Sequence, residues 1–309
     1  MNRTLSKNVV VNVQVKRPKK ANWKIGRLLF ILPVVLYLLA IFVYPIYRTI
    51  VMGFENYSIT SIGTGEAPFV GLDNYINLFK MGLTWKVLEN TLLFVVGSIV
   101  FQITIGMLLA LFFSKKFPLN GLLRSLLLIP WLLPLIVSGT AFQWIFNQSH
   151  GVLNWFLMNL HIIDKPIAWL VSPHTALLST IITNIWVGIP FSMVLFYSGL
   201  QDIPPELYEA AAIDGCNAWK KFWFITVPSM RAVIAVVLML SLIYTLKVFD
   251  IIMIMTGGGP ANASDILSTW SYNLSFQQLL FGQGSAVANI MILISLIFAF
   301  FYIKITKNL

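Results

Sequence analysis

The sequence predicts an all-α membrane protein with six transmembrane helices and both ends of the chain in the cytoplasm. Of the 309 residues, 58% are hydrophobic and only 10% are charged, whereas about 25% of a soluble domain is charged. A helix needs about 20 mostly apolar residues to cross a bilayer, and the chain offers six such stretches. The Lys and Arg residues are concentrated in alternate connections, which orients these stretches. The single cysteine, Cys216, excludes a disulfide-stapled secreted domain, and the hydrophobicity excludes disorder.

The first three apolar stretches do not alternate between apolar and polar residues, which indicates helices rather than the strands of a barrel. The first has no small-residue cleavage site and exceeds the apolar part of a signal peptide, so we expect it to be retained. In the third, Pro130 and Pro134 flank Trp131 and predict a kinked helix. These three predicted spans are Leu28–Ile50, Val87–Phe113 and Ser125–Phe146.

The last three stretches are equally apolar, except that the fifth contains two charged residues, Lys247 and Asp250. Unpaired charges in lipid are costly, and residues three apart share one face of a helix. We therefore predict an internal ion pair between the two; direct contact with a substrate is the alternative. The three predicted spans are Thr175–Leu200, Ala232–Met255 and Ala286–Ile305.

Sixteen of the 21 Lys and Arg residues fall on one predicted side of the membrane. They lie in the segment 1–27, after the second span, after the fourth span and at the end of the chain. The opposite side has four, namely Arg48, Lys80, Lys86 and Lys165. By the positive-inside rule both termini are cytoplasmic. The net charge of +10 is thus explained by topology, and we expect no nucleic-acid partner.

The chain has none of the common signatures of nucleotide, metal or catalytic sites. No P-loop sequence G-x-x-x-x-G-K-[ST] occurs in it. His150, His161 and His174 share one connection, but their spacing matches no compact metal-ligand motif. We expect no metal site, no catalytic residue and no cofactor bound by this chain.

The connection between the fourth and fifth spans, residues 203–228, predicts two short helices joined by a turn. A first helix over Pro205–Asp214 follows from the proline, which suits the first helical position. Gly215 is a natural stop, because glycine adopts the left-handed conformation that closes helices. Asn217 can cap a second helix that runs to Val227.

This connection resembles the EAA motif of binding-protein-dependent ABC importer permeases, whose pattern is E-A-A-x-x-D-G-A, five residues, then F-x-x-I-x-L-P. It departs from that pattern at Cys216 and Val227. The resemblance implies a type I (MetI-like) permease core in which this loop docks in a cleft of an ATPase subunit. An ordinary amphipathic connector at the membrane interface, with the glutamate a solvated surface charge, is the alternative. The residues implied in coupling to the ATPase are Glu209, Ala210, Ala211, Asp214 and Gly215, and the motif continues at Phe222, Ile225 and Pro228.

The segment Thr256–Pro260, with Phe249 and Asp250 before it, resembles the F-D…T-G/N-G-G-P pattern of maltose-type sugar permeases, on the MalF side of the permease pair. This resemblance implies a second, MalG-like permease subunit and two copies of an ATPase subunit that hold ATP and Mg. It also implies an extracytoplasmic solute-binding protein and a place in the bacterial cytoplasmic membrane.

The predicted organisation has three parts. Residues 1–27 form a basic cytoplasmic segment, and residues 28–86 form a peripheral first transmembrane helix and an external loop. Residues 87–305 form a five-helix ABC permease core that contains the coupling loop at 203–228.

A substrate path through such a core needs polar groups for sugar hydroxyls and aromatic faces for sugar rings. On the fourth span, Asn184, Gly188 and Phe191 follow a spacing that places them on one helical face. For any single residue, helix packing or a buried hydrogen bond is the alternative. The full set of candidates is Trp131, Asn184, Gly188, Phe191, Ser241, Tyr244 and Thr245, and Val248 is a further neighbour.

The resulting hypothesis is a permease subunit of an ATP-driven importer for a sugar or oligosaccharide, and not an enzyme. An ABC permease for another solute, such as a phosphorylated polyol, is the alternative; an anionic substrate predicts basic lining residues, of which Lys247 is the sole candidate. A stand-alone secondary transporter would need no ATPase. An intramembrane enzyme would need a polar cluster inside the bundle, hinted at only by Lys247, Asp250 and Glu89.

Overall fold

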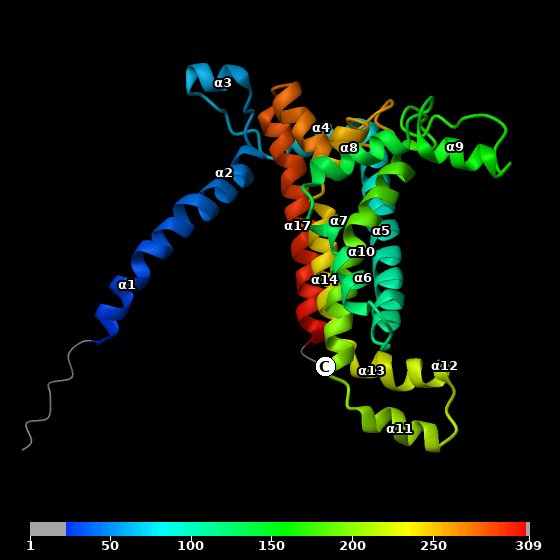
Figure 1. Ribbon diagram of the computed structural model, residues 1–309. Helices are drawn as coiled ribbons and strands as arrows, with labels where there is room; N and C mark the ends of the chain where they lie inside the picture. The colour runs from blue at the N-terminus through cyan, green and yellow to red at the C-terminus, as the bar shows by residue number, and fades with distance from the viewer. Residues whose placement is uncertain (1–22, 307–309) are drawn as a thin grey trace, which may run out of the picture. The chain divides into compact units, whose positions relative to one another are not determined.

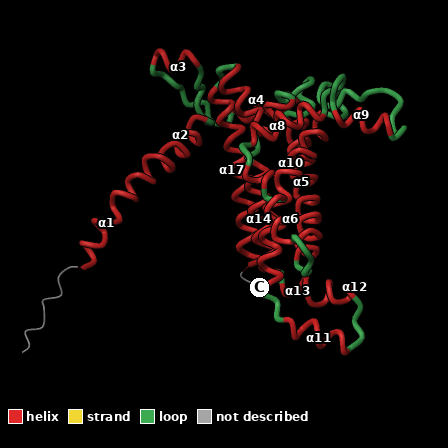
Figure 2. Tube along the Cα trace, viewed as in Figure 1, coloured by secondary structure: helices red, strands yellow, loops and turns green. Residues whose placement is uncertain are grey.

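The computed structural model describes residues 23–306, and it is helical throughout apart from turns, loops and one isolated β-bridge between Glu55 and Phe69 (Figures 1 and 2). Most of the predicted basic segment 1–27 lies outside the described residues. The helices are α1 (Trp23–Leu38), α2 (Tyr44–Met52), α3 (Ile59–Thr64), α4 (Asp73–Lys80), α5 (Leu83–Phe113), α6 (Asn120–Leu126), α7 (Ile129–Leu132), α8 (Leu135–Ile145), α9 (Val152–Asn159), α10 (Ala176–Gln201), α11 (Pro205–Ile213), α12 (Ala218–Lys221), α13 (Val227–Ser229), α14 (Arg231–Leu246), α15 (Asp250–Met255), α16 (Leu267–Tyr272) and α17 (Phe281–Thr306), with π-helical turns η1 (Leu39–Val43), η2 (Phe222–Thr226) and η3 (Asn273–Gln277).

The chain divides into two compact units between Arg48 and Thr49. In the first unit, α1, η1 and the start of α2 form a helical stretch that begins at Trp23 and overlaps the first predicted span. The second unit contains the rest of α2 and the remaining helices. Whether the first helix is peripheral to the permease core stays a prediction.

Four helical stretches are long and apolar enough to cross a membrane, and two bent helix pairs raise the number to six when each pair is taken as one span. Each of the six predicted apolar stretches overlaps one of these helices or bent pairs, so the all-α class with its six apolar stretches is confirmed. The single stretches are Phe30–Met52, Leu83–Phe113, Ala176–Gln201 and Phe281–Lys304, and the bent pairs are Asn120–Leu132 with Leu135–Ile145 and Ala218–Ser229 with Arg231–Leu246.

The third predicted span is broken more sharply than a kink. Its two halves meet at 96°, and the break falls at Leu133 and Pro134, both of which have extended backbones. Proline disfavours the helical conformation of the residue before it, which explains why α7 ends at Leu132. Trp131 therefore lies in the last turn before the break.

The fifth predicted span, Ala232–Met255, is wrong as one continuous helix. The helix α14 ends at Leu246, the residues up to Phe249 are non-helical, and α15 begins only at Asp250. At the other end of α14, a bend of 72° near Met230 separates it from α12 and α13.

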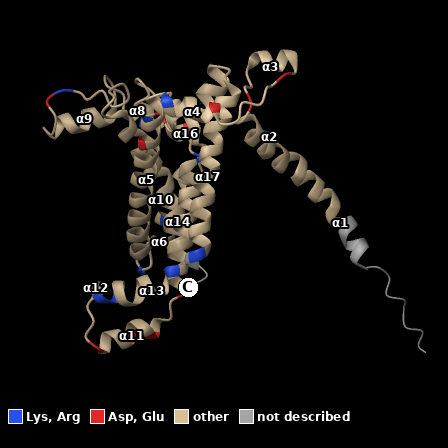
Figure 3. Cartoon of the chain, turned by 180° about the vertical axis from the view of Figure 1, so that it is seen from behind, with Lys and Arg blue, Asp and Glu red and all other residues tan. Residues whose placement is uncertain are grey.

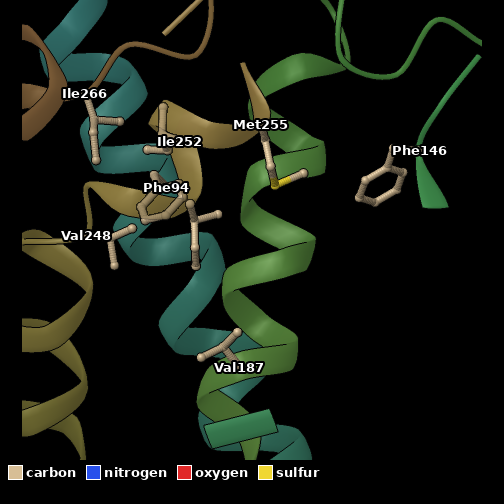
Figure 4. Close-up of a cluster of buried hydrophobic side chains, with 8 residues drawn as sticks. Phe94, Phe146, Val187, Val248, Ile252, Met255 and Ile266 are labelled. Atoms are coloured by element: carbon tan, nitrogen blue, oxygen red, sulfur yellow. The ribbon is translucent and has the colours of Figure 1, made fainter. Parts of the chain in front are cut away.

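In the second unit, α5, α10, α14 and α17 run side by side as a bundle (Figure 1). We call its two ends the α11 end and the α9 end, after the helices that lie there. At the α9 end, an apolar cluster joins α5, α10 and α15, and Figure 4 shows Phe94, Val187, Val248, Ile252 and Met255 converging. At the α11 end, a second apolar cluster includes Met107, Ala110, Phe113, Met193, Phe196, Ile203, Met230 and Val237.

Candidate functional site

A cavity of about 350 Å³ lies in the bundle beside the apolar cluster at the α9 end. Val187 and Val248 belong both to this cluster and to the lining of the cavity. All seven residues predicted for the substrate path line it, and so do Lys247 and Asp250. The structure thus brings together residues from α7, α10, α14 and the link to α15. The lining consists of Gln102, Trp131, Leu133, Leu135, Asn184, Val187, Gly188, Phe191, Ser241, Tyr244, Thr245, Lys247, Val248 and Asp250.

Two buried polar atoms in the cavity wall have no hydrogen-bond partner among the described residues. They are the amide nitrogen of Asn184 and the hydroxyl of Ser241, and their side chains are almost fully buried. Leaving such a group unpaired costs about 1–3 kcal/mol. A ligand that carries hydroxyl groups would offset this cost, because hydroxyls both donate and accept hydrogen bonds.

A row of aromatic rings forms the other part of the wall. The ring centroids of Trp131 and Phe191 are 5.6 Å apart, and those of Phe191 and Tyr244 are also 5.6 Å apart. Trp131 and Tyr244 are each about half exposed, at 47% and 51%. An aromatic surface of this kind offers apolar faces against which a sugar ring packs.

The structure does not contain the predicted ion pair between Lys247 and Asp250, and this prediction is corrected. No ion pair between them occurs in the described part of the chain, and the Lys247 Nζ atom instead lies 4.9 Å from the centroid of the Tyr244 ring. The reason is the helix break: Lys247 follows the last residue of α14 and Asp250 begins α15, so their three-residue spacing does not place them on one helical face. Both side chains nevertheless line the cavity.

Gln102 of α5 is the polar lining residue that sequence reasoning missed. Its Nε2 atom donates a hydrogen bond of 2.9 Å to the backbone oxygen of Asn184. Gly188 makes room for it, since a Cβ atom at this position would lie 2.4 Å from Gln102 Nε2. An amide side chain in the middle of a mostly apolar predicted span was the available signal. Glu89, by contrast, is exposed on α5 and does not line the cavity.

The loop 203–228 at the α11 end has the predicted form of two helices joined by a turn. The turn at Gly215 is left-handed, with φ of 73°, and Cys216 N donates to Ala211 O at 2.8 Å. Asn217 caps α12, because its side-chain oxygen accepts from Lys220 N at 2.9 Å. The second helix is interrupted by η2, so α12 itself ends at Lys221.

The residues of the EAA motif divide between the two faces of α11. Ala211 is buried, whereas Glu209, Ala210, Asp214 and Gly215 are exposed. The exposed carboxylates give this helix an acidic outer face, which Figure 3 shows in red. Such a face is available to a partner that carries basic residues.

The helix α11 is fastened to η2 through its inner face. The hydroxyl groups of Tyr208 and Thr226 share a hydrogen bond of 2.9 Å. Tyr208, Phe222 and Ile225 also pack against the apolar cluster at the α11 end of the bundle. These contacts connect α11 with the apolar cluster to which α5 and α10 contribute at this end of the bundle.

The segment with the T-G-G-G-P sequence forms a turn that is held on the start of α5. Asn90 Nδ2 donates to the backbone oxygens of Asn262 and Asp265, at 3.1 and 3.0 Å. The Asp265 carboxylate accepts a hydrogen bond from the Thr269 hydroxyl at 2.7 Å and is buried, and this burial raises the pKa of Asp265.

Within residues 23–306, no cluster of three or more His, Cys, Asp or Glu side chains has the arrangement of a metal site.

Comparison with known proteins identifies a matching protein family and similar relatives. A family model described as "Binding-protein-dependent transport system inner membrane component" matches residues 102–307. The chain is 34% identical over 284 residues to the trehalose/maltose transport system permease protein MalF of Thermococcus litoralis, covering 92% of this chain and 94% of the relative. It is 31% identical over 288 residues to the lactose transport system permease protein LacF of Rhizobium radiobacter, covering 91% and 94%.

Among solved structures, the fold is similar to a chain of a bacterial ABC transporter involved in the import of the acidic polysaccharide alginate. The TM-score is 0.78 at 23% identity, and the match covers 93% of this chain and 96% of that chain. A chain of the MetNI methionine ABC transporter matches with a TM-score of 0.52 at 15% identity, covering 76% and 98%. At these identities the likeness concerns the fold alone.

Proposed function

This chain belongs to the family of binding-protein-dependent transport system inner membrane components, and from that membership we propose that it moves a sugar or an oligosaccharide across the cytoplasmic membrane. It acts as the permease subunit of an ATP-driven importer. The observation that carries the substrate class is the cavity wall, where the unpaired polar atoms of Asn184 and Ser241 lie in the same cavity as an aromatic row.

The charges of the cavity favour a neutral sugar over a phosphorylated polyol. An anionic substrate would be expected to meet an excess of basic groups, but the lining holds one base, Lys247, and one acid, Asp250. The names of the two relatives, which refer to trehalose, maltose and lactose, support the same class.

The proposal includes several partners. A MalG-like permease subunit completes the membrane part, and two ATPase subunits hold ATP and Mg at the α11 end, which faces the cytoplasm together with both termini. A solute-binding protein delivers the sugar on the opposite side, at loops near residues 147–174 and 257–285. Because ATP drives the cycle, the ATP-bound ATPase dimer has to favour one permease conformation over the other.

The substrate class is tested first with the solute-binding protein of the proposed importer. A ligand screen that compares mono- and oligosaccharides with phosphorylated polyols, read by thermal shift, is expected to select a neutral sugar. Selection of a phosphorylated polyol would contradict the proposed substrate.

Replacing Ser241 by alanine tests whether the cavity binds that sugar. We expect the KM of uptake to rise about tenfold, because a substrate hydroxyl loses a partner in a buried site. Ser138→Ala is the matched control: its hydroxyl is also buried and without a partner among the described residues, but it does not line the cavity. Equal effects of the two variants on the KM would exclude a specific contact at Ser241.

Tyr208→Phe tests whether the contact between α11 and η2 carries the ATPase movement. Removing the hydroxyl breaks the hydrogen bond to Thr226 and keeps the packed ring. A hydrogen bond contributes about 1 kcal/mol, so we expect the ATP hydrolysed per sugar transported to rise about fivefold.

Two further variants sharpen this test. Adding Thr226→Val to Tyr208→Phe should change the ratio little more, because both substitutions remove the same contact. Tyr197→Phe serves as the control, since the Tyr197 ring contacts Arg124 and its hydroxyl has no hydrogen-bond partner in the described part of the chain. An unchanged ratio in Tyr208→Phe would show that coupling does not pass through this bond.

A further inference from the structure

The segment of α12 and η2 carries large apolar side chains that stay exposed within the described part of the chain. Trp219 is 69% exposed, Trp223 is 48% exposed and Phe224 is 78% exposed. Lys220, on the same segment, is also exposed, and Lys221 is half-buried. Exposed tryptophan next to lysine is the composition of helices that lie in the headgroup region of a membrane.

The position of this segment separates it from the acidic face of α11. Phe222 and Ile225 pack against the apolar cluster at the end of the bundle, and Tyr208 links α11 to Thr226 of η2. Consequently α12 and α13 form a layer next to the bundle, and α11 forms the next layer out (Figures 1 and 3). The inner layer carries lysine and the outer layer carries glutamate and aspartate.

A groove of about 540 Å³ runs between the inner layer and the bundle. Its walls are mainly apolar and come from α5, α10, α12 and η2, and Tyr208 of α11 also lines it. Leu108, which is 59% exposed, continues from this groove onto the outer surface of α5, where Phe101 and Phe112 are also exposed. The lining residues are Leu108, Leu111, Ser114, Leu200, Tyr208, Ala218, Trp219, Lys221, Phe222 and Thr226.

We infer that this groove binds an anionic phospholipid of the leaflet at the α11 end. The acyl chain lies between Leu108 and Trp219, and the phosphate is held by Lys220 and Lys221. Two features point to a lipid: the groove is continuous with the exposed apolar surface of α5, a helix long and apolar enough to span a membrane, and the basic layer has the charge that attracts anionic headgroups. The acidic layer of α11 remains for the ATPase, so the two layers have different partners. The inference rests on the proposed function only for the place of the ATPase.

The test uses the complete transporter, with both permease subunits and the ATPases, in vesicles of phosphatidylcholine with increasing amounts of phosphatidylglycerol. After extraction in a mild detergent, retained lipid is measured by mass spectrometry. We expect the wild type to retain phosphatidylglycerol in preference to phosphatidylcholine. In Lys220→Gln/Lys221→Gln, the ratio of retained phosphatidylglycerol to retained phosphatidylcholine should fall about tenfold. Trp219→Ala should lower the retention of both lipids, because it removes a wall of the groove.

The control Lys80→Gln/Lys165→Gln removes two exposed lysines at the α9 end and should leave lipid retention unchanged. Equal preference in the wild type and in Lys220→Gln/Lys221→Gln would overturn the inference. Loss of ATPase assembly from that variant in every lipid mixture would overturn it as well, because it would assign the basic layer to the ATPase. Lipid retention is measured without sugar, so failure of the proposed substrate would leave this result intact.

Discussion

We expect uptake of the sugar to fall by about 30-fold or more when Glu209 is replaced by lysine, and insertion of the permease into the membrane to be unchanged. Glu209 is exposed on α11, six residues before the left-handed turn at Gly215. In the proposed complex it meets a basic residue of the ATPase, so the substitution places two like charges together in a desolvated contact. Losing one partner of such a pair is expected to weaken binding on this scale. The measurement is sugar uptake into vesicles, with co-purification of the ATPase as the second readout.

Glu66→Lys is the matched control for this charge reversal. Glu66 is exposed in a loop outside residues 203–228, so the net charge of the chain changes equally without touching α11. We expect wild-type uptake and assembly from this variant. If Glu209→Lys also assembled and transported normally, the loop would be an ordinary connector at the membrane interface, and the proposed coupling through α11 would be wrong.

The contrast between α10 and α14 shows which parts of the cavity could be predicted. Asn184, Gly188 and Phe191 were placed on one face by helical spacing alone, and they do line the cavity because α10 continues unbroken through them. The same argument failed for Lys247 and Asp250. The residues between them, Val248 and Phe249, are neither glycine nor proline, so the local sequence contains no signal that predicts the end of α14.

Contacts between distant parts of the chain could not be predicted from local sequence patterns either. Gln102 is separated by 82 residues from Asn184, whose backbone it contacts, and only the packing of α5 on α10 reveals that Gly188 leaves space for it. The loop 203–228 behaved in the opposite way. Its two helices and their turn were predicted because Pro205, Gly215 and Asn217 act through the backbone within a few residues.

Gly188→Leu is expected to reduce sugar uptake on the order of 100-fold while the ATPases still assemble. Any side chain at this position meets Gln102, whose atoms lie 2.4–2.8 Å from the place of a Cβ. Leucine would displace Gln102 from the Asn184 backbone and fill the centre of the cavity. Overpacking and a newly unpaired amide together cost a few kcal/mol, which corresponds to this loss. Uptake and binding-protein-stimulated ATP hydrolysis, measured on the same vesicles, separate a blocked cavity from a misfolded subunit.

Two comparisons make this prediction specific to the cavity. Gly121→Leu adds the same side chain at the start of α6, where nothing lies within 4 Å of the place of a Cβ, and it should transport normally. In the smaller variant Gly188→Ala the conflict is with Gln102, so Gln102→Ala/Gly188→Ala should be no worse than Gln102→Ala alone. Full uptake by Gly188→Leu would mean that the sugar does not pass beside Asn184 and Gln102, because a leucine there leaves no room for both the substrate and the glutamine.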